Sequence, residues 1–295
     1  VKAIERFQPA ALICTHFLPL SPLAHLAKKG KLGAPLYCVV TDFGGHPVWA
    51  YEGVTGYFVA SAEGREDLAD WGVPWDNVRV TGIPIDPRFS TLVPKRDART
   101  DMGLDPDRPV ALIMGGGNGV GPMHSMAQRL LALDCRPQVV VIAGRNEDML
   151  ARLQQLEDRH PESMRAVGFS DEVDRWLDTA DVNVTKPGGL TSSETLAKQV
   201  PMVIYRPTPG QEDRNSQALT TVGAALRART LDHVVEAVDR VLTRPDLART
   251  MQDACKFLGR PEAAVDIAEC VISDTDPGRG ETDHVTVRGE PVPRS

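Results

Sequence analysis

The sequence predicts an α/β protein made of two doubly wound parallel-sheet domains. Short apolar runs alternate with helical patterns through most of the 295 residues. Strands that are apolar throughout are typical of parallel sheets covered on both faces. A proline-containing stretch, residues 82–94, interrupts the alternation once and marks the expected boundary between the domains. The length of the chain also favours two domains over one.

Nine apolar runs are expected to be strands, and three longer patterns between them are expected to be helices. The strands are expected at residues 11–14, 36–40, 57–60, 78–81, 110–114, 139–143, 182–185, 202–205 and 223–226. The helices are expected at 122–133, 147–159 and 191–198. We expect a short first domain with its hinge over 1–93 and a second domain with C-terminal helices over 94–273. Residues 274–295, rich in Asp, Gly, Pro and Arg, are expected to be a disordered tail.

Composition narrows the class of protein. The formal net charge of −7 argues against a nucleic-acid binder, which would usually carry a basic surface. Five widely spaced cysteines, mostly inside apolar runs, indicate reduced thiols and no disulfide framework. No apolar run reaches the roughly eighteen residues of a membrane span. Because no charged-then-apolar leader opens the chain, we expect a cytoplasmic protein.

The first glycine-rich turn follows the expected strand at 110–114 and opens a helix. Its residues Gly116, Gly117, Asn118 and Gly119 let backbone N–H groups approach an anion, and the helix N-terminus adds partial positive charge. The Gly-Lys-Ser/Thr ending of a P-loop is absent, and no acidic residue follows the next strand as in a dinucleotide fold. The turn therefore predicts a phosphate site, and a tight turn without a ligand is the alternative.

The second turn, residues 186–191, lies between the strand at 182–185 and a helix. We expect Gly188, Gly189 and Thr191 to present amide and hydroxyl donors to a diphosphate. Glu194, one helical turn later, would accept hydrogen bonds from two ribose hydroxyls. Because Thr191 and Glu194 also match a capping box, a purely capping role for Glu194 stays open.

A third polar element, residues 209–215, follows the strand at 202–205. Its side chains Gln211, Glu212 and Asn215 would lie beside the second turn and could bind sugar hydroxyls. The alternative is an ordinary helix N-terminus rich in acidic residues, which the helix dipole favours.

Together these stretches resemble the monogalactosyldiacylglycerol synthase family and its bacterial processive diacylglycerol glycosyltransferase relatives. A more distant likeness is to the N-acetylglucosaminyltransferase that makes the peptidoglycan lipid precursor. The segments that carry the resemblance occur in family order: Val40-Thr41-Asp42-Phe43 with His46-Pro47 and Trp49, Tyr57 to Ser61, Val80 to Asp86 with Phe89, residues 115–121, Val167-Gly168-Phe169, Lys186 to Thr191 with Glu194, and Pro209 to Glu212 with Asn215.

The resemblance implies a GT-B fold and an inverting transfer of a hexose from UDP-galactose or UDP-glucose to a diacylglycerol-type lipid. It assigns the backbone at Gly168 and Phe169 to uracil and Glu194 to ribose. The remaining donor contacts that it implies are diphosphate contacts by residues 115–121, Lys186, Gly188, Gly189, Leu190 and Thr191, and sugar contacts by Gln211, Glu212 and Asn215. His46 and Trp49 would face the acceptor.

Three departures from the family pattern stand out. Asn118 replaces a glutamate that is usual in the first glycine turn, and Phe17 follows His16 where the family has proline. The family's Gly-rich amino-terminal segment, with the histidine proposed as the base, has no counterpart. We therefore expect the amino-terminal part to be missing, and the chain alone to bind UDP-sugar but turn over poorly.

Asp42 and His16 are then the candidates for the general base. Asp42 follows the strand at 36–40 and would alternatively cap the next turn, and His16 would alternatively be a buried histidine at a strand end. We expect no metal and no cofactor beyond the UDP-sugar itself, since the two Asp-x-Asp spacings, 105–107 and 274–276, lie in a turn and in the tail.

A lipid acceptor implies a peripheral position on the inner face of the membrane. The basic cluster at residues 28–31 would serve such contact or simply end a helix. Two other classes of function remain open: a UDP-sugar epimerase of similar fold, and a non-catalytic UDP-sugar-binding protein.

Overall fold

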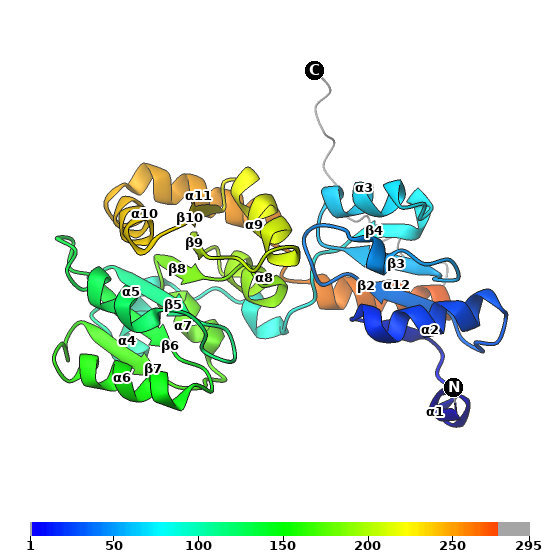
Figure 1. Ribbon diagram of the computed structural model, residues 1–295, viewed down its shortest axis with the longest axis horizontal. Helices are drawn as coiled ribbons and strands as arrows, with labels where there is room; N and C mark the ends of the chain where they lie inside the picture. The colour runs from blue at the N-terminus through cyan, green and yellow to red at the C-terminus, as the bar shows by residue number, and fades with distance from the viewer. Residues whose placement is uncertain (1, 277–295) are drawn as a thin grey trace, which may run out of the picture.

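The computed structural model describes residues 2–276, which form two parallel α/β domains (Figure 1). The first domain holds a four-stranded sheet of order β1-β2-β3-β4 in which every pair is parallel. Its strands are β1 (Leu12–Cys14), β2 (Leu36–Val39), β3 (Gly56–Val59) and β4 (Val78–Val80). These strands confirm the four expected in this half of the chain, within one or two residues at each end.

Helices cover the first sheet and enclose its core. They are α1 (Lys2–Phe7), α2 (Phe17–Lys28), η1 (Pro47–Trp49), α3 (Ala62–Asp70) and η2 (Trp75–Asn77). Leu20 of α2 and Leu68 of α3 are fully buried and pack with strand side chains such as Cys38. Helix α2 ends at Lys28, where Gly30 takes a positive φ of 66° and its N–H bonds the carbonyl of Ala27. The basic cluster therefore lies at an ordinary helix end.

The second domain holds a six-stranded parallel sheet of order β10-β9-β8-β5-β6-β7. Its strands are β5 (Val110–Met114), β6 (Gln138–Ile142), β7 (Met164–Val167), β8 (Val182–Thr185), β9 (Met202–Tyr205) and β10 (Ala225–Ala228). The chain adds strands to one side of β5 and then returns to add β8, β9 and β10 on the other side. The strand order thus reverses between β5 and β8, which is where ligands bind in open α/β sheets.

Helices pack on both faces of the second sheet, and a short linker precedes it. The linker carries η3 (Pro87–Ser90) and α4 (Lys95–Asp101), and the helices are α5 (Met123–Leu130), α6 (Glu147–Glu157), α7 (Val173–Thr179), α8 (Gly189–Ala197), α9 (Gln211–Thr221), α10 (Leu231–Thr243) and α11 (Pro245–Leu258). Phe89 of the linker is buried in the core under β5 and β6, so the linker belongs to the second domain by packing. Strand β7 was not expected, because the polar Arg165 interrupts its short apolar run.

The last described helix, α12 (Ala263–Thr275), returns to the first domain. Its Ile267 and Val271 pack on the first sheet, and Figure 1 shows α12 alongside β2. Asp274 accepts hydrogen bonds from Tyr37 Oη at 3.3 Å and Arg79 Nη2 at 3.2 Å. The expectation that residues 94–273 all belong to the second domain and that the tail begins at residue 274 is therefore wrong for α12. The apolar face of a helix does not reveal which sheet it covers. Residues 277–295 of the expected tail lie outside the described residues.

Candidate functional site

The two glycine-rich turns lie side by side at the carboxyl edge of the second sheet. The first follows β5 and the second follows β8, and Met114 and Thr185, the last residues of these strands, are directly paired. Both turns therefore open at the point where the strand order reverses. Two segments about 70 residues apart in the chain therefore lie at the same edge of the sheet.

The first turn is held open by contacts that only glycine permits. Gly119 has a φ of +56°, and a Cβ there would lie 1.9 Å from the carbonyl oxygen of Ala143. The side chain of Asn146 donates to the carbonyl of Gly119 at 3.0 Å. Within the described residues, the N–H groups of residues 116–118 donate to no acceptor. They are exposed and free to bind an anion.

The second turn leads directly into α8, whose N-terminus carries no side-chain cap. The helix begins at Gly189, with Gly188 as its N-cap, so Thr191 is already its third residue. The capping box expected for Thr191 and Glu194 is therefore absent, and the capping interpretation of Glu194 is wrong. The first N–H groups of a helix have no partner inside the helix. Those of residues 189–191 donate to no acceptor within the described residues, and the helix dipole gives this end partial positive charge.

Glu194 lies in α8, about one turn after the helix begins at Gly189. Its side chain makes no hydrogen bond with any described residue. Burial, together with the nearby Asp86 carboxylate, raises the pKa of Glu194 to about 7. A carboxyl group that is partly ionised at neutral pH and lacks a partner can exchange hydrogen bonds with ligand hydroxyls.

The loop after β7 lies at the same edge of the sheet, two strands away from β5. Gly168 is half-buried, and the Phe169 ring is 54% exposed. The guanidinium carbon of Arg145 lies 4.6 Å from the centre of that ring, and the Arg145 N–H donates to the carbonyl of Gly117 at 3.0 Å. Arg145 stands after β6, where a dinucleotide fold would place an acid, and no role for it was predicted from the sequence. In the structure it joins the first glycine turn to the loop expected to hold uracil.

Polar side chains of α9 bridge the two domains. Asn215 is 1% exposed, and its Nδ2 donates to Asp42 Oδ1 at 3.3 Å and to the Pro187 carbonyl at 3.0 Å. Gln211 donates to the other oxygen of Asp42. The expectation that Asn215 holds the sugar is not matched by this geometry, because its amide is occupied by the domain interface.

Asp42 is buried beneath these two amides. Its carboxylate accepts from Gln211 and Asn215 and from no N–H of the following turn, so the capping interpretation is wrong. Burial raises the pKa of Asp42, and the two hydrogen bonds and the nearby His46 partly oppose that rise. Glu212, expected at the sugar, instead accepts from the N–H of Thr208, three residues before its own helix begins.

Of the residues considered for the acceptor side, the two histidines are exposed and the tryptophan is buried. His16 and His46 are exposed, and each caps a helix: Nδ1 of His16 accepts from the N–H of Leu18 and Nδ1 of His46 from that of Val48, both at 3.1 Å. His16 is therefore not the buried histidine of the alternative interpretation. Trp49 is 2% exposed and packs edge-on against Phe17, so its expected place at the acceptor is wrong.

Two family models match this chain in order. Monogalactosyldiacylglycerol (MGDG) synthase matches residues 1–85, and the glycosyltransferase family 28 C-terminal domain matches residues 110–267, more than half of the chain. A processive diacylglycerol beta-glucosyltransferase of Bacillus pumilus (strain SAFR-032) is 32% identical over 92% of this chain and 71% of its own length. The protein of the same name from Bacillus subtilis (strain 168) is 30% identical with the same coverage.

The chain belongs to the monogalactosyldiacylglycerol synthase and processive diacylglycerol glycosyltransferase family. This confirms the resemblance found in its motifs. The chain is thus a glycosyltransferase by family.

Solved structures confirm the GT-B fold of this glycosyltransferase. A putative UDP-N-acetylglucosamine 2-epimerase from Listeria monocytogenes superposes with a TM-score of 0.70 at 18% identity, over 92% of this chain and 76% of that one. MurG of Acinetobacter baumannii gives a TM-score of 0.64 at 15% identity, over 92% and 75%. At such identities the likeness concerns the fold alone.

Residues 2–276 of the glycosyltransferase show neither a metal-binding cluster nor a membrane-spanning helix. No three side chains of the metal-binding types stand close enough together there to hold an ion. No helix in the same range has the length and apolar character needed to cross a bilayer.

Proposed function

We propose that this glycosyltransferase moves a hexose, with inversion, from a UDP-sugar to a hydroxyl of a diacylglycerol-type lipid. Binding of the UDP-sugar donor is supported chiefly by the two adjacent turns after β5 and β8. Their N–H groups are free, and Glu194 beside them has no hydrogen-bond partner. The names of the family relatives support the acceptor half, because both are processive diacylglycerol beta-glucosyltransferases.

The diphosphate would lie against the N–H groups of residues 116–118 and 189–191. These dipoles are fixed before the donor arrives and face the oxygens on which charge develops as UDP departs. Lys186 adds a full positive charge at the second turn and forms no ion pair within the described residues. This arrangement needs no metal ion to neutralise the leaving group.

The nucleoside would extend from the diphosphate toward β7. Glu194 would accept the two ribose hydroxyls, and the backbone at Gly168 and Phe169 would read the uracil edge. Arg145, held against the Phe169 ring, would keep this loop in place. Asp86 pairs with Arg88 at 3.0 Å, and Arg88 donates to the carbonyl of Asp171 at 2.7 Å, which ties the same loop to the linker.

Asp42 is the residue that we propose as general base. In His16 and His46 the Nδ1 atom accepts a hydrogen bond, so the proton of the neutral ring is on Nε2. A protonated Nε2 donates and cannot take the acceptor's proton. Asp42 is buried at the domain interface, and burial raises its pKa, which makes its ionised form a stronger base. Gln211, bonded to the same carboxylate, would hold it beside the sugar.

Glucose is the hexose that we propose. The relatives' names specify a beta-glucosyl product, and UDP-glucose carries its glucose in the α configuration, so the transfer inverts the anomeric carbon. UDP-galactose is the competing donor. Because the acceptor is a lipid, we place the protein on the inner face of the membrane as a peripheral protein.

The test combines this chain, UDP-glucose labelled in the sugar, and vesicles with or without diacylglycerol. We expect label in a lipid-extractable product only when diacylglycerol is present, even if the rate is low. Asp42→Asn should lower kcat by roughly a hundredfold, within the range of lost general-base catalysis, with little change in UDP affinity. A change of the UDP-sugar without lipid would favour an epimerase, and UDP binding without turnover would favour a non-catalytic binder.

A further inference from the structure

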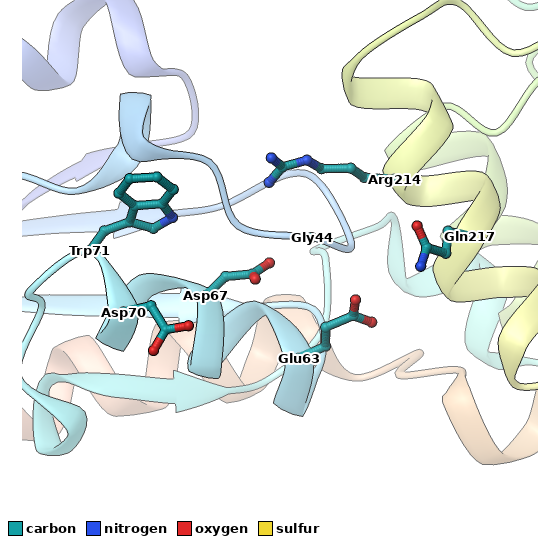
Figure 2. A pocket seen from close by; sticks show the side chains of 7 residues that line it. All are labelled: Gly44, Glu63, Asp67, Asp70, Trp71, Arg214 and Gln217. Atoms are coloured by element: carbon teal, nitrogen blue, oxygen red, sulfur yellow. The ribbon is translucent and has the colours of Figure 1, made fainter.

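The loop after β2 carries Asp42, the proposed base, and lies between α3 of the first domain and α9 of the second. Figure 2 shows Asp67 of α3 and Arg214 of α9 on opposite sides of this loop at Gly44. Beside the loop, a hollow of about 230 Å³ with a mostly polar lining separates the two helices. Because Gly44 and Gly45 have no side chains to pack, hydrogen bonds must decide where this part of the loop lies.

Two side chains from different domains hold the backbone of Gly45. Its N–H donates to Asp67 Oδ2 at 2.7 Å, and its carbonyl accepts from Arg214 Nη1. Within residues 2–276 neither Asp67 nor Arg214 forms an ion pair, so each side chain bonds only this glycine. A Cβ at Gly45 would lie 2.5 Å from the Cβ of Asp67, so a larger residue would displace the loop.

Phe43, two residues earlier, is held in the same way. Its N–H donates to Asn215 of α9 at 2.8 Å, and its carbonyl accepts from Ser61, the N-cap of α3, at 2.9 Å. Each domain therefore binds the backbone of this loop twice, on either side of Gly44.

One side of α9 makes all these contacts from the second domain. Gln211, Arg214 and Asn215 are spaced i, i+3 and i+4, which places them on the same side of a helix. Gln211 bonds Asp42 and would also bond the sugar, so its amide would be shared between base and donor. Arg214 bonds the loop three residues beyond Asp42 and keeps the loop in place without touching either.

We propose that Arg214 is a positioning residue for the transfer, which holds the Gly45 carbonyl and so keeps the Asp42 carboxylate beside the donor sugar. This rests on the proposed function, in which Asp42 is the base and Gln211 a sugar contact. Asp67 is the corresponding residue of the first domain. Neither Arg214 nor Asp67 would touch the substrate, so their effect on the rate would pass through Asp42.

The test compares the unmodified chain, Arg214→Ala, Asp42→Asn and the double variant. For each, kcat and KM are measured with labelled UDP-glucose and diacylglycerol vesicles. Arg214→Ala should lower kcat roughly 10- to 100-fold, as a displaced catalytic group does, and leave the KM for UDP-glucose unchanged. In the Asp42→Asn background it should lower kcat no further, because the carboxylate through which it acts is gone. Arg214 is exposed, so the variant should fold.

Two variants serve as controls for Arg214→Ala. Arg214→Lys should keep most of the activity, since only one N–H of Arg214 is used at Gly45 and an ammonium group can supply it. Arg227→Ala removes a guanidinium that pairs with Asp213 of α9 at 2.6 Å and makes no contact with the loop within the described residues. It should leave kcat unchanged.

The glycines test the same loop from the first domain. Gly45→Ala should lower kcat as Arg214→Ala does, because its Cβ would clash with Asp67. Gly44→Ala should not, because its Cβ would meet no atom closer than 3.4 Å.

Amide hydrogen exchange tests the geometry without turnover. The N–H groups of Phe43 and Gly45 should exchange faster in Arg214→Ala than in the unmodified chain, and at the unmodified rate in Arg227→Ala. The proposal is overturned if these amides exchange alike in Arg214→Ala and the unmodified chain. It is also overturned if Arg214→Ala lowers kcat by the same factor with and without the Asp42 carboxylate. If Asp42→Asn itself keeps full kcat, the proposed function fails at its base, which distinguishes the two failures.

Discussion

The carboxamide oxygen of Asn215 on α9 accepts a hydrogen bond of 2.8 Å from the backbone N–H of Phe43, in the loop after β2. The buried Asn215 side chain thus accepts from a backbone N–H of the first domain and also donates to Asp42 and to the Pro187 carbonyl. The interface between the domains is therefore specified by hydrogen bonds at the candidate site and not by apolar packing alone.

Asn215→Ala should destabilise the protein, because it leaves the Phe43 N–H and the Pro187 carbonyl buried without partners. The cost expected for such groups is about 1–3 kcal/mol. Urea unfolding would measure it. Gln217→Ala, exposed on the same helix, should change the free energy of unfolding by no more than about 0.5 kcal/mol. Equal stability of the two variants would show that the bridge contributes nothing.

Gly189→Ala should push the domains apart. A Cβ at Gly189 would lie 2.0 Å from the carbonyl oxygen of Thr41 in the first domain, a backbone atom that cannot move alone. At the neighbouring Gly188 a Cβ would meet nothing within 4 Å, and φ is −67°. Small-angle scattering should show a larger radius of gyration for Gly189→Ala and an unchanged one for Gly188→Ala. If both variants scatter alike, the close contact at Gly189 does not hold the domains together.

UDP binding should release protons near neutral pH through Glu194. Burial and Asp86 raise its pKa from 4.5 to about 7, so at pH 7 the free protein holds part of a proton there. Ribose hydroxyls that donate to the carboxylate favour its ionised form and lower this pKa. Affinity for UDP should therefore rise as pH increases through 7. Calorimetry in buffers of different ionisation enthalpy would count the released protons.

Glu194→Gln is the control for that experiment, since UDP's own phosphate ionises equally with both proteins. The variant should release fewer protons and bind UDP roughly 10- to 100-fold more weakly, as expected for lost hydrogen bonds to a charged group. The raised pKa of Glu194 also makes the stability of the fold depend on pH. The stabilising contribution of this carboxyl group is fully present below pH 4.5 and is lost as pH rises through about 7. Proton release that is identical in both proteins would remove Glu194 from the ribose site.

Replacing Lys198 alone should destabilise the protein far more than replacing Lys198 and Asp178 together. Their ion pair is 2.7 Å long, with side chains only 1% and 4% exposed, and Lys198 also donates to the linker carbonyl of Thr91 at 2.6 Å. Lys198→Met should cost about 3–5 kcal/mol because it leaves the carboxylate buried alone. Adding Asp178→Leu should recover much of this loss. Thermal unfolding of the three proteins tests it, and a double variant no better than the single one would contradict it.

Much of the fold could be predicted from the sequence because its signals are local. Continuous apolar strands such as residues 110–114 identify parallel sheets, and the proline-containing stretch identifies the linker. The glycine-rich turns after β5 and β8 also indicated where the candidate site lies, beside the point at which the strand order reverses. The partner of α12 could not be predicted, because Ile267 and Val271 would cover either sheet equally well.

The candidate site was predictable only where a residue acts through its own backbone or local turn. The glycine turns are of this kind. The roles of Asn215 and Trp49 depend on what lies across the interface or beneath the strand, which one sequence does not contain. Arg145 was missed because its partner, the Phe169 ring, belongs to a different strand end.

We propose that the adjacent turns after β5 and β8 hold a nucleoside diphosphate. A crystal structure with UDP tests it most directly. We expect phosphate oxygens at about 2.7–3.2 Å from the backbone nitrogens of residues 116–118 and 189–191, with both ribose hydroxyls donating to Glu194. A diphosphate bound elsewhere, or a Glu194 carboxylate that turns away from the ribose, would contradict it.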